Sequence, residues 1–374
     1  MLKRLLLISL FGLMIIPTLS HAEGTLVMDS ETFEKAKVLE VTNRGTTTVA
    51  GIDTSSAVQT LTIEVLGGKD KGKVVTFRND YIQLDEGDVF YVRHQSNQLD
   101  DSDFWSVADP YRLDVLLWLA IAFVVLIFVF GGIQGVRGLA SLIGSFFLIF
   151  YLLIPGIYGG YNAILVSIGV ASLIIIVGSY ITHGVNRTTT SAVISMIITV
   201  VLTGLTAYYV VHIGKLSGYS SEESTYLTLN TRGAISMVGL LFGGIMIGLL
   251  GVLYDIAIGQ AIAIEELFRA GKHMTRKEVY KRGIRIGREH IGALVNTLAI
   301  AYVGASLPLL LLMQSSAVGT LFIINSEIFA TEIVRILIGS IGLILAVPIT
   351  TLIASYMLYG KVQESSEAAH GHRH

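Results

Sequence analysis

Apolar residues along this chain gather into long runs that begin after residue 110 and continue almost to the C-terminus. Each run approaches the roughly 20 residues that an α-helix needs to cross the hydrocarbon core of a bilayer. The pattern therefore predicts an α-helical polytopic membrane protein with about seven transmembrane helices between residues 108 and 360. The expected spans are Leu113–Phe130, Gly138–Ile154, Ala163–Ile181, Ser191–Ile213, Ala234–Ile258, Ile291–Met313 and Ile333–Leu358.

Residues 23–107 follow a different pattern, in which short alternating runs are separated by turns. Leu61 and Ile63 alternate with polar neighbours, and glycine-containing turns lie at 67–72 and 86–87. Alternation with a period of two, interrupted by glycine, is typical of β-strands. We expect a small all-β domain of four or five strands, an OB-like or SH3-like barrel. The expected strands are 36–41, 58–66, 73–78, 88–94 and a last one near 105–107.

The two ends of the chain carry simpler patterns. Lys3 and Arg4 precede an apolar stretch at Leu5–Ile16, and Ser20–Ala22 resembles a small-x-small cleavage site. Residues 1–22 are therefore predicted to be a signal peptide, with an uncleaved anchor helix as the alternative. Residues 361–374 are predicted to form a disordered tail.

Charge gives the expected orientation. Hydrophobic residues make up 52% and charged residues 14% of the chain, against about 25% charged residues in soluble domains, so a bilayer is the expected solvent. The basic residues between spans fall in alternate loops, which by the positive-inside rule places the β domain outside and the C-terminus inside. The loop after the fifth span is the most basic, with Arg269, Lys272, Arg276, Lys277, Lys281, Arg282, Arg285 and Arg288.

Several classes of function are disfavoured. There is no cysteine, which removes disulfides and thiol chemistry. Residues 23–105 hold 8 basic and 15 acidic residues, the wrong balance for binding nucleic acid. The chain has no P-loop, HExxH or GxSxG motif. We therefore expect no enzyme activity, no cofactor and no metal site.

Ionisable groups inside apolar runs are the candidate functional residues, because they are costly in a bilayer. Gly244, Gly248, Gly251 and Asp255 share one helix face, and glycines permit close helix packing. We expect Asp255 to point into the bundle and to couple a proton or cation, or else to be a structural carboxylate. Glycine faces favour packing within one chain and between two chains equally, so the oligomeric state stays open.

Two further groups are candidates. Glu289 and Asn296 lie on one stripe of the sixth span, where Asn296 can hydrogen-bond a substrate or act as interhelical glue. Glu332 and Arg335 are spaced i,i+3 at the start of the seventh span. We expect them to form an ion pair, which would gate a transporter, or else Arg335 would attract an anion into the bundle.

The basic loop, Gly259–His290, is expected to lie along the membrane surface as an amphipathic helix. Ile264, Leu267, Phe268 and Val279 would face lipid, and the basic residues would bind lipid headgroups or, alternatively, a cytoplasmic partner. The segment 319–331, too short to span, is expected to be re-entrant or interfacial.

Several stretches resemble the YibE/YibF family of bacterial integral membrane proteins. They are Asp109–Arg112, Gly251–Ile258, Gly287–Thr297, Ala301–Pro308 and Asn325–Ile328. The resemblance covers nearly the whole chain and is most specific at Gly287–Thr297. It implies a bacterial plasma-membrane protein and no particular activity, and it includes both Asp255 and Asn296.

Two functions follow as hypotheses. The first is a secondary transporter or flippase coupled through Asp255. The second is a receptor or assembly factor that does not transport and whose outer domain, residues 23–107, engages an envelope protein.

Overall fold

The computed structural model describes residues 30–48, 55–97, 102–271, 273–315 and 318–359. These residues form two compact units that divide between Val129 and Phe130. The first holds all the strands and is called the β unit; the second is the helical unit. The expected signal peptide and C-terminal tail lie outside the described residues, as does Lys272.

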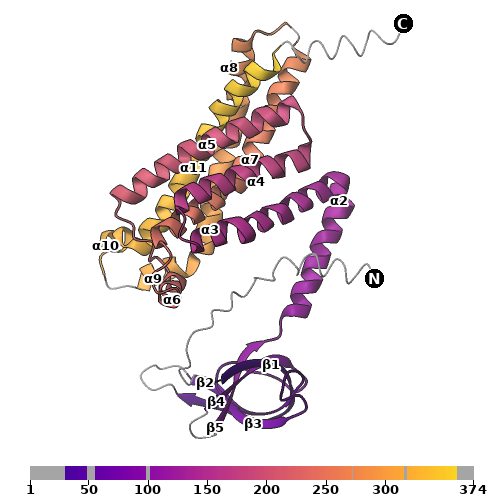
Figure 1. Cartoon of the computed structure of the whole chain (residues 1–374), viewed down its shortest axis with the longest axis vertical. Helices are drawn as coiled ribbons and strands as arrows, with labels where there is room; N and C mark the ends of the chain where they lie inside the picture. The colour runs from indigo at the N-terminus through magenta and orange to yellow at the C-terminus, as the bar shows by residue number, and fades with distance from the viewer. Residues whose placement is uncertain (1–29, 49–54, 98–101, 272, 316–317, 360–374) are drawn as a thin grey trace. The chain divides into compact units, whose positions relative to one another are not determined.

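Five antiparallel strands form one curved sheet in the β unit (Figure 1). The strands are β1 Ser30–Thr48, β2 Ser55–Val65, β3 Val74–Asn79, β4 Val89–Asn97 and β5 Ser102–Pro110. Their order is β3-β2-β1-β4-β5. The alternating pattern therefore located every described strand, although β1 and β5 are longer than expected.

The long central strand β1 lets one sheet curve into a half-barrel. Ala36 pairs with Val65 of β2 on one side and with Phe90 of β4 on the other. Alternate side chains of all three strands are fully buried, so one face of the sheet forms the core. Within the described strands, hydrogen-bonded pairing leaves β3 and β5 as edges. The sheet is thus an antiparallel half-barrel, which agrees in part with the small OB-like or SH3-like barrel expected.

The helical elements follow the five strands. They are α2 Leu113–Leu148, the π-helix η2 Ile149–Leu153, α3 Ile154–Tyr158, α4 Ala163–His183, α5 Arg187–Ile213, α6 Glu222–Asn230, α7 Met237–Ala270, α8 Arg276–Ala305, α9 Leu307–Ser315, α10 Thr320–Asn325 and α11 Glu327–Leu358. The segment 319–331 holds α10 and the start of α11.

By length and composition, the described helical runs are fewer than the seven expected spans, because one long run contains the first two of them. Five described helical runs are long and apolar enough to cross a membrane, and a sixth counts if α8 and α9, bent by 64°, form one broken span. The first two expected spans belong to a single run, Leu113–Tyr158. Gly132 interrupts this run with φ 52° and ψ −143°, a conformation that only glycine adopts readily. The bend between α8 and α9 lies next to Pro308, which lacks an N–H donor.

The most extensive helix–helix contact in the helical unit is between α5 and α11, and α7 also packs against both (Figure 1). Ser195, Thr199 and Thr203 of α5 are fully buried. A Cβ on Gly342 of α11 would lie 2.8 Å from Thr203 Oγ1. Ser195 and Thr199 donate to backbone carbonyls four residues earlier, at 2.6 and 2.8 Å. Small and hydroxylated residues at such an interface let membrane helices approach closely.

A second junction holds α8 against α7 and α11. The Gln260 side-chain amide of α7 is buried and donates to the Gly283 carbonyl at 2.8 Å and to Thr351 Oγ1 at 2.7 Å. Gly283 and Gly287 face this junction, where a Cβ would collide with Ile264 and Val347 respectively. Because Gly283 and Gly287 have no side chain, α8 can pack closely against α7 and α11.

The basic segment is not the surface helix that its composition predicted. It consists of the end of α7, a turn and the first turns of α8. Thr275 and Glu278 form a capping box that begins α8, a favourable helix start. Ile264, Phe268 and Val279 are buried in the protein core, and Leu267 packs against it. Their apolar face covers protein rather than lipid.

We expect Gly287→Ala to destabilise the helical unit by about 1–3 kcal/mol, because the new methyl group overpacks the junction. Gly292→Ala is the matched control, since a Cβ there meets nothing within 4 Å. The measurement is the thermal unfolding midpoint of the purified chain in detergent. Equal midpoints for the two variants would contradict the packing described.

Candidate functional site

Asp255 is the most conspicuous polar residue of the helical unit. It lies near the middle of the 34-residue α7, and its side chain is exposed. Gly244, Gly251 and Gly259 share this face, and a Cβ on any of them would meet nothing within 4 Å. Among the described residues, Asp255 has no hydrogen-bond or ion-pair partner. The expectation that it points into the bundle is therefore wrong.

The face of α8 on which Glu289 and Asn296 were expected to lie together is also exposed. The Tyr302 hydroxyl lies against Gly248, and Gln260 lies beside Gly287, so Asp255 is level with the part of α8 between these contacts. Glu289 and Asn296 belong to that part, and both are exposed. Within the described residues, neither forms a hydrogen bond. The structure thus brings Asp255 and Asn296 to similar depth without joining them, and Asn296 is not interhelical glue here.

Glu332 and Arg335 form an ion pair, as their spacing predicts. Arg335 Nη1 lies 2.9 Å from Glu332 Oε1 and 3.2 Å from Oε2. The guanidinium lies 5.8 Å from the centre of the Tyr302 ring, within the range of a cation–π contact. Arg335 Nε is buried without a partner among the described residues. The pair therefore links α11 to α8.

The described basic residues divide into two groups. Arg269 pairs with Glu265 at 2.5 Å, and Arg276 lies over the rings of Tyr356 and Tyr359, at 5.1 and 4.4 Å. The first pair lies within α7, whereas Arg276 holds the start of α8 against the end of α11. The remaining side chains all project outward from the first turns of α8: Lys277, Lys281, Arg282, Arg285 and Arg288.

Sequence reasoning missed the role of Glu327, the first residue of α11. Its carboxylate accepts from the Ser217 backbone N–H at 2.7 Å, the Ser217 hydroxyl at 2.7 and 2.8 Å, and the Gly218 backbone N–H at 2.7 Å. Glu327 thereby fixes the loop between α5 and α6. The residues are more than 100 positions apart, so no local pattern indicates the contact.

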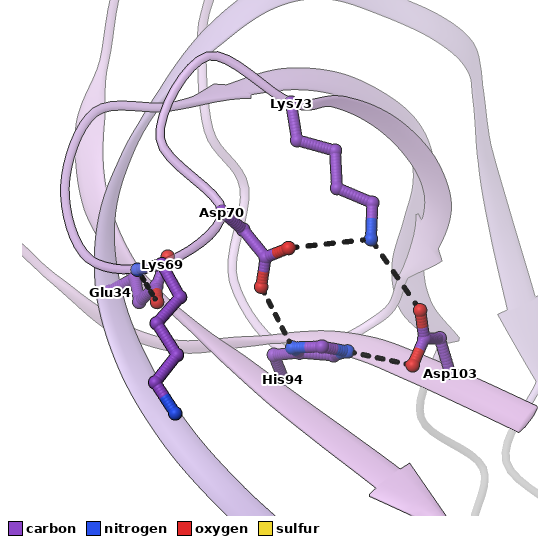
Figure 2. Close-up of polar contacts among 6 residues, drawn as sticks. All are labelled: Glu34, Lys69, Asp70, Lys73, His94 and Asp103. Carbon is purple, nitrogen blue, oxygen red and sulfur yellow. Dashed lines mark hydrogen bonds and ion pairs between the residues drawn. The ribbon is translucent and has the colours of Figure 1, made fainter. Parts of the chain in front are cut away.

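A polar cluster in the β unit was also missed (Figure 2). The His94 ring lies between two carboxylates, with Nδ1 3.2 Å from Asp70 Oδ2 and Nε2 2.9 Å from Asp103 Oδ1. Lys73 Nζ lies 3.6 Å from Asp70 Oδ1 and 3.5 Å from Asp103 Oδ2. The cluster joins β4, β5 and the β2–β3 loop.

Stacking and a tight turn complete this arrangement. The His94 and Trp105 rings stack with centroids 3.9 Å apart and planes 5° apart. Glu34 Oε1 accepts from the Lys69 backbone N–H at 3.1 Å. Gly68 has a φ of +73°, and a Cβ there would collide with Glu34. The β2–β3 loop is thus held over one end of the sheet's buried face.

The surroundings of Asp103 perturb its acidity. The hydrogen bond from His94 is the main cause that lowers its pKa below the ordinary 3.8, with help from the charges of His94 and Lys73 and against a desolvation cost. Hydrogen bonding to a carboxylate favours its ionised form. Among the described residues, no group of three or more His, Asp or Glu side chains is placed to hold a metal.

The apolar helices and the preceding sheet define a membrane protein with a multi-helix unit after an antiparallel β half-barrel. Within that class, the chain belongs to the YibE/F-like protein family, whose model matches residues 119–360. The matched region begins within α2 and contains Asp255, Asn296 and Glu327. No curated protein and no solved structure matches the chain.

The Asp103 geometry predicts an acid limit to stability. Because its folded pKa is lowered, the carboxylate stabilises the fold above its unfolded pKa, and this contribution is lost as pH falls through the folded value, below 3.8. We expect Asp103→Asn to reduce this acid loss. The readout is urea unfolding from about pH 5 to about pH 3, followed by Trp105 fluorescence in a Trp118→Phe background. Asp85→Asn, at an exposed ion pair with Arg44, should retain the loss.

Proposed function

We propose that the protein is a secondary transporter or flippase in which Asp255 binds the coupling proton or cation. The observation that carries the proposal is an exposed carboxylate at mid-helix, beside three glycines that leave free space around it. A gap next to a titratable group is what an ion or a substrate headgroup needs in order to approach.

The cost of exposing a carboxylate to lipid supports this view. Placing an aspartate at the centre of a membrane helix costs roughly 2.5–3.5 kcal/mol on insertion scales. Because Asp255 has no partner among the described residues, water, an ion or another chain must cover it. Water and ions reach the middle of a membrane helix only through a polar path, and such a path is the basis of transport.

Other residues receive roles from their positions. Asn296 lies at a similar depth on α8 and would hydrogen-bond the substrate, with Glu289 about two helical turns away. Glu332 and Arg335 would gate, because their ion pair joins α11 to α8 through Tyr302. The outward cations of α8 would bind anionic headgroups. Their charge also supports a plasma-membrane protein with the β unit outside.

We expect a single cysteine in place of Asp255 to react with a membrane-impermeant thiol reagent. The chain has no native cysteine, so labelling reports one position. A water-filled path predicts labelling that differs between intact cells and inverted vesicles and changes with pH or sodium. Ile344→Cys is the matched control, an exposed apolar position near the middle of α11, and should stay unlabelled.

The companion variant is Asp255→Asn, which preserves shape and removes the charge. It should abolish coupled transport while leaving the protein folded. An Asp255→Cys protein that folds but resists labelling from both sides would refute the water-filled path. Transport retained by Asp255→Asn would refute the coupling role alone.

A second candidate function is a receptor or assembly factor that binds an envelope protein through the β unit. A groove of about 420 Å³ lies between the end of β3 and the outer face of β5. Phe33, Tyr81 and Phe104 line it and are 60%, 67% and 59% exposed. Arg78 also lines it and has no ion-pair partner among the described residues. Exposed aromatics with an arginine are typical of protein-binding surfaces.

Photo-crosslinking tests this candidate in cells. A photoreactive residue at Phe104, inside the groove, should give one discrete adduct that Arg78→Ala weakens at least about tenfold, the loss expected for a binding hot spot. The same residue at Leu39, exposed but outside the groove, should give none. Equal adducts at both positions would contradict a specific surface.

Deletion of residues 23–105 separates the two functions, because a receptor loses all activity and a transporter keeps part.

A further inference from the structure

The His94 cluster contains more hydrogen-bonding contacts than a neutral histidine can make. Both ring nitrogens lie within 3.2 Å of a carboxylate oxygen. A neutral imidazole carries one N–H, so its second nitrogen would present a lone pair to the other carboxylate. Only the imidazolium donates to Asp70 and Asp103 together. Both hydrogen bonds of the ring can therefore form only when His94 is protonated.

The charges around His94 come from every element packed against it. The β2–β3 loop supplies Asp70 and Lys73, and β5 supplies Asp103. Glu34 of β1 occupies the same end of the sheet, with its Oε2 buried and unpaired among the described residues. With His94 protonated, the two positive charges match Asp70 and Asp103. With His94 neutral, an excess of negative charge remains around a side chain that is only 13% exposed.

The cluster fastens a loop over the core. Asp70 and Lys73 belong to the β2–β3 loop, whereas His94 and Asp103 belong to the sheet. Lys73 Nζ also lies 5.0 Å from the centre of the Trp105 ring. Lys73 directly precedes the edge strand β3, and Asp103 lies in the other edge strand, β5. Loss of the cluster would therefore free the loop and uncover Trp105 at the open side of the half-barrel.

We propose that the β unit carries a pH-operated latch, in which protonated His94 holds the β2–β3 loop closed through Asp70 and Asp103, and deprotonation releases it. Histidine is the side chain whose ordinary titration range includes physiological pH. The latch is closed while both ring nitrogens of His94 carry a proton, and it opens when one of these protons is lost. It is independent of the transport proposed for Asp255, since it lies in the other unit.

The test uses the full-length chain with one cysteine in the loop, Lys71→Cys. Residue 71 is exposed and forms no contact in the cluster. Thiol labelling is measured from about pH 5.5 to about pH 8. Each rate is divided by that of Glu86→Cys, in the exposed turn before β4, which removes the effect of thiol ionisation. We expect the ratio to rise about fivefold toward alkaline pH, the factor given by roughly 1 kcal/mol.

His94→Gln is the decisive variant, because glutamine cannot gain a proton. Its labelling ratio should not change with pH, while Trp105 fluorescence in the Trp118→Phe background reports that the unit is folded. If His94→Gln fails to fold, Asp70→Asn serves instead and should reduce the rise. A ratio that is flat in the parent protein overturns the latch. A rise that persists unchanged in a folded variant also overturns it, since another group then controls the loop.

Discussion

Close contact between helices that lack side-chain bulk is the constraint on which the helical unit depends. Where α7, α8 and α11 meet, Gln260 reaches both the Gly283 carbonyl and the Thr351 hydroxyl only because Gly283 and Gly287 let α8 approach. Between α5 and α11, buried hydroxyls and Gly342 have the same effect. Burying apolar surface contributes little to the association of helices inside a bilayer. Close packing and hydrogen bonds between helices must therefore stabilise it. The positions of the remaining polar groups follow from these junctions.

Much of the fold could be predicted from local pattern. Period-two alternation located the strands because one face of the half-barrel is buried, and the apolar runs located the spanning helices. The expected count of seven takes Leu113–Phe130 and Gly138–Ile154 as separate spans, and the structure places both in one run with a kink at Gly132. The basic segment was misjudged because charge marks the expected membrane boundary and not the end of a helix. The Thr275 and Glu278 capping box was the available indication that a helix begins there.

The candidate sites were predicted less well, for reasons that differ between the two units. Asp255 was identified from its charge, but its direction was wrong because several stripes of small residues compete as packing faces. The neighbours of α7 use the face of Gln260 and leave the face of Gly251 open. The His94 cluster collects side chains from β4, β5 and a loop. No spacing within one segment indicates such a site; it follows from sheet topology alone.

What covers Asp255 distinguishes the two functions. A receptor needs a permanent cover, such as a helix of a second copy on the open glycine face, and the carboxylate would then be fixed in one environment. A transporter needs a cover that changes, so that the same carboxylate meets water from each side in turn. A helix face made of glycines suits a transporter, because no side chains on it obstruct a helix that moves across it. Accessibility of position 255 from the two sides therefore bears on function more directly than any further feature of the fold.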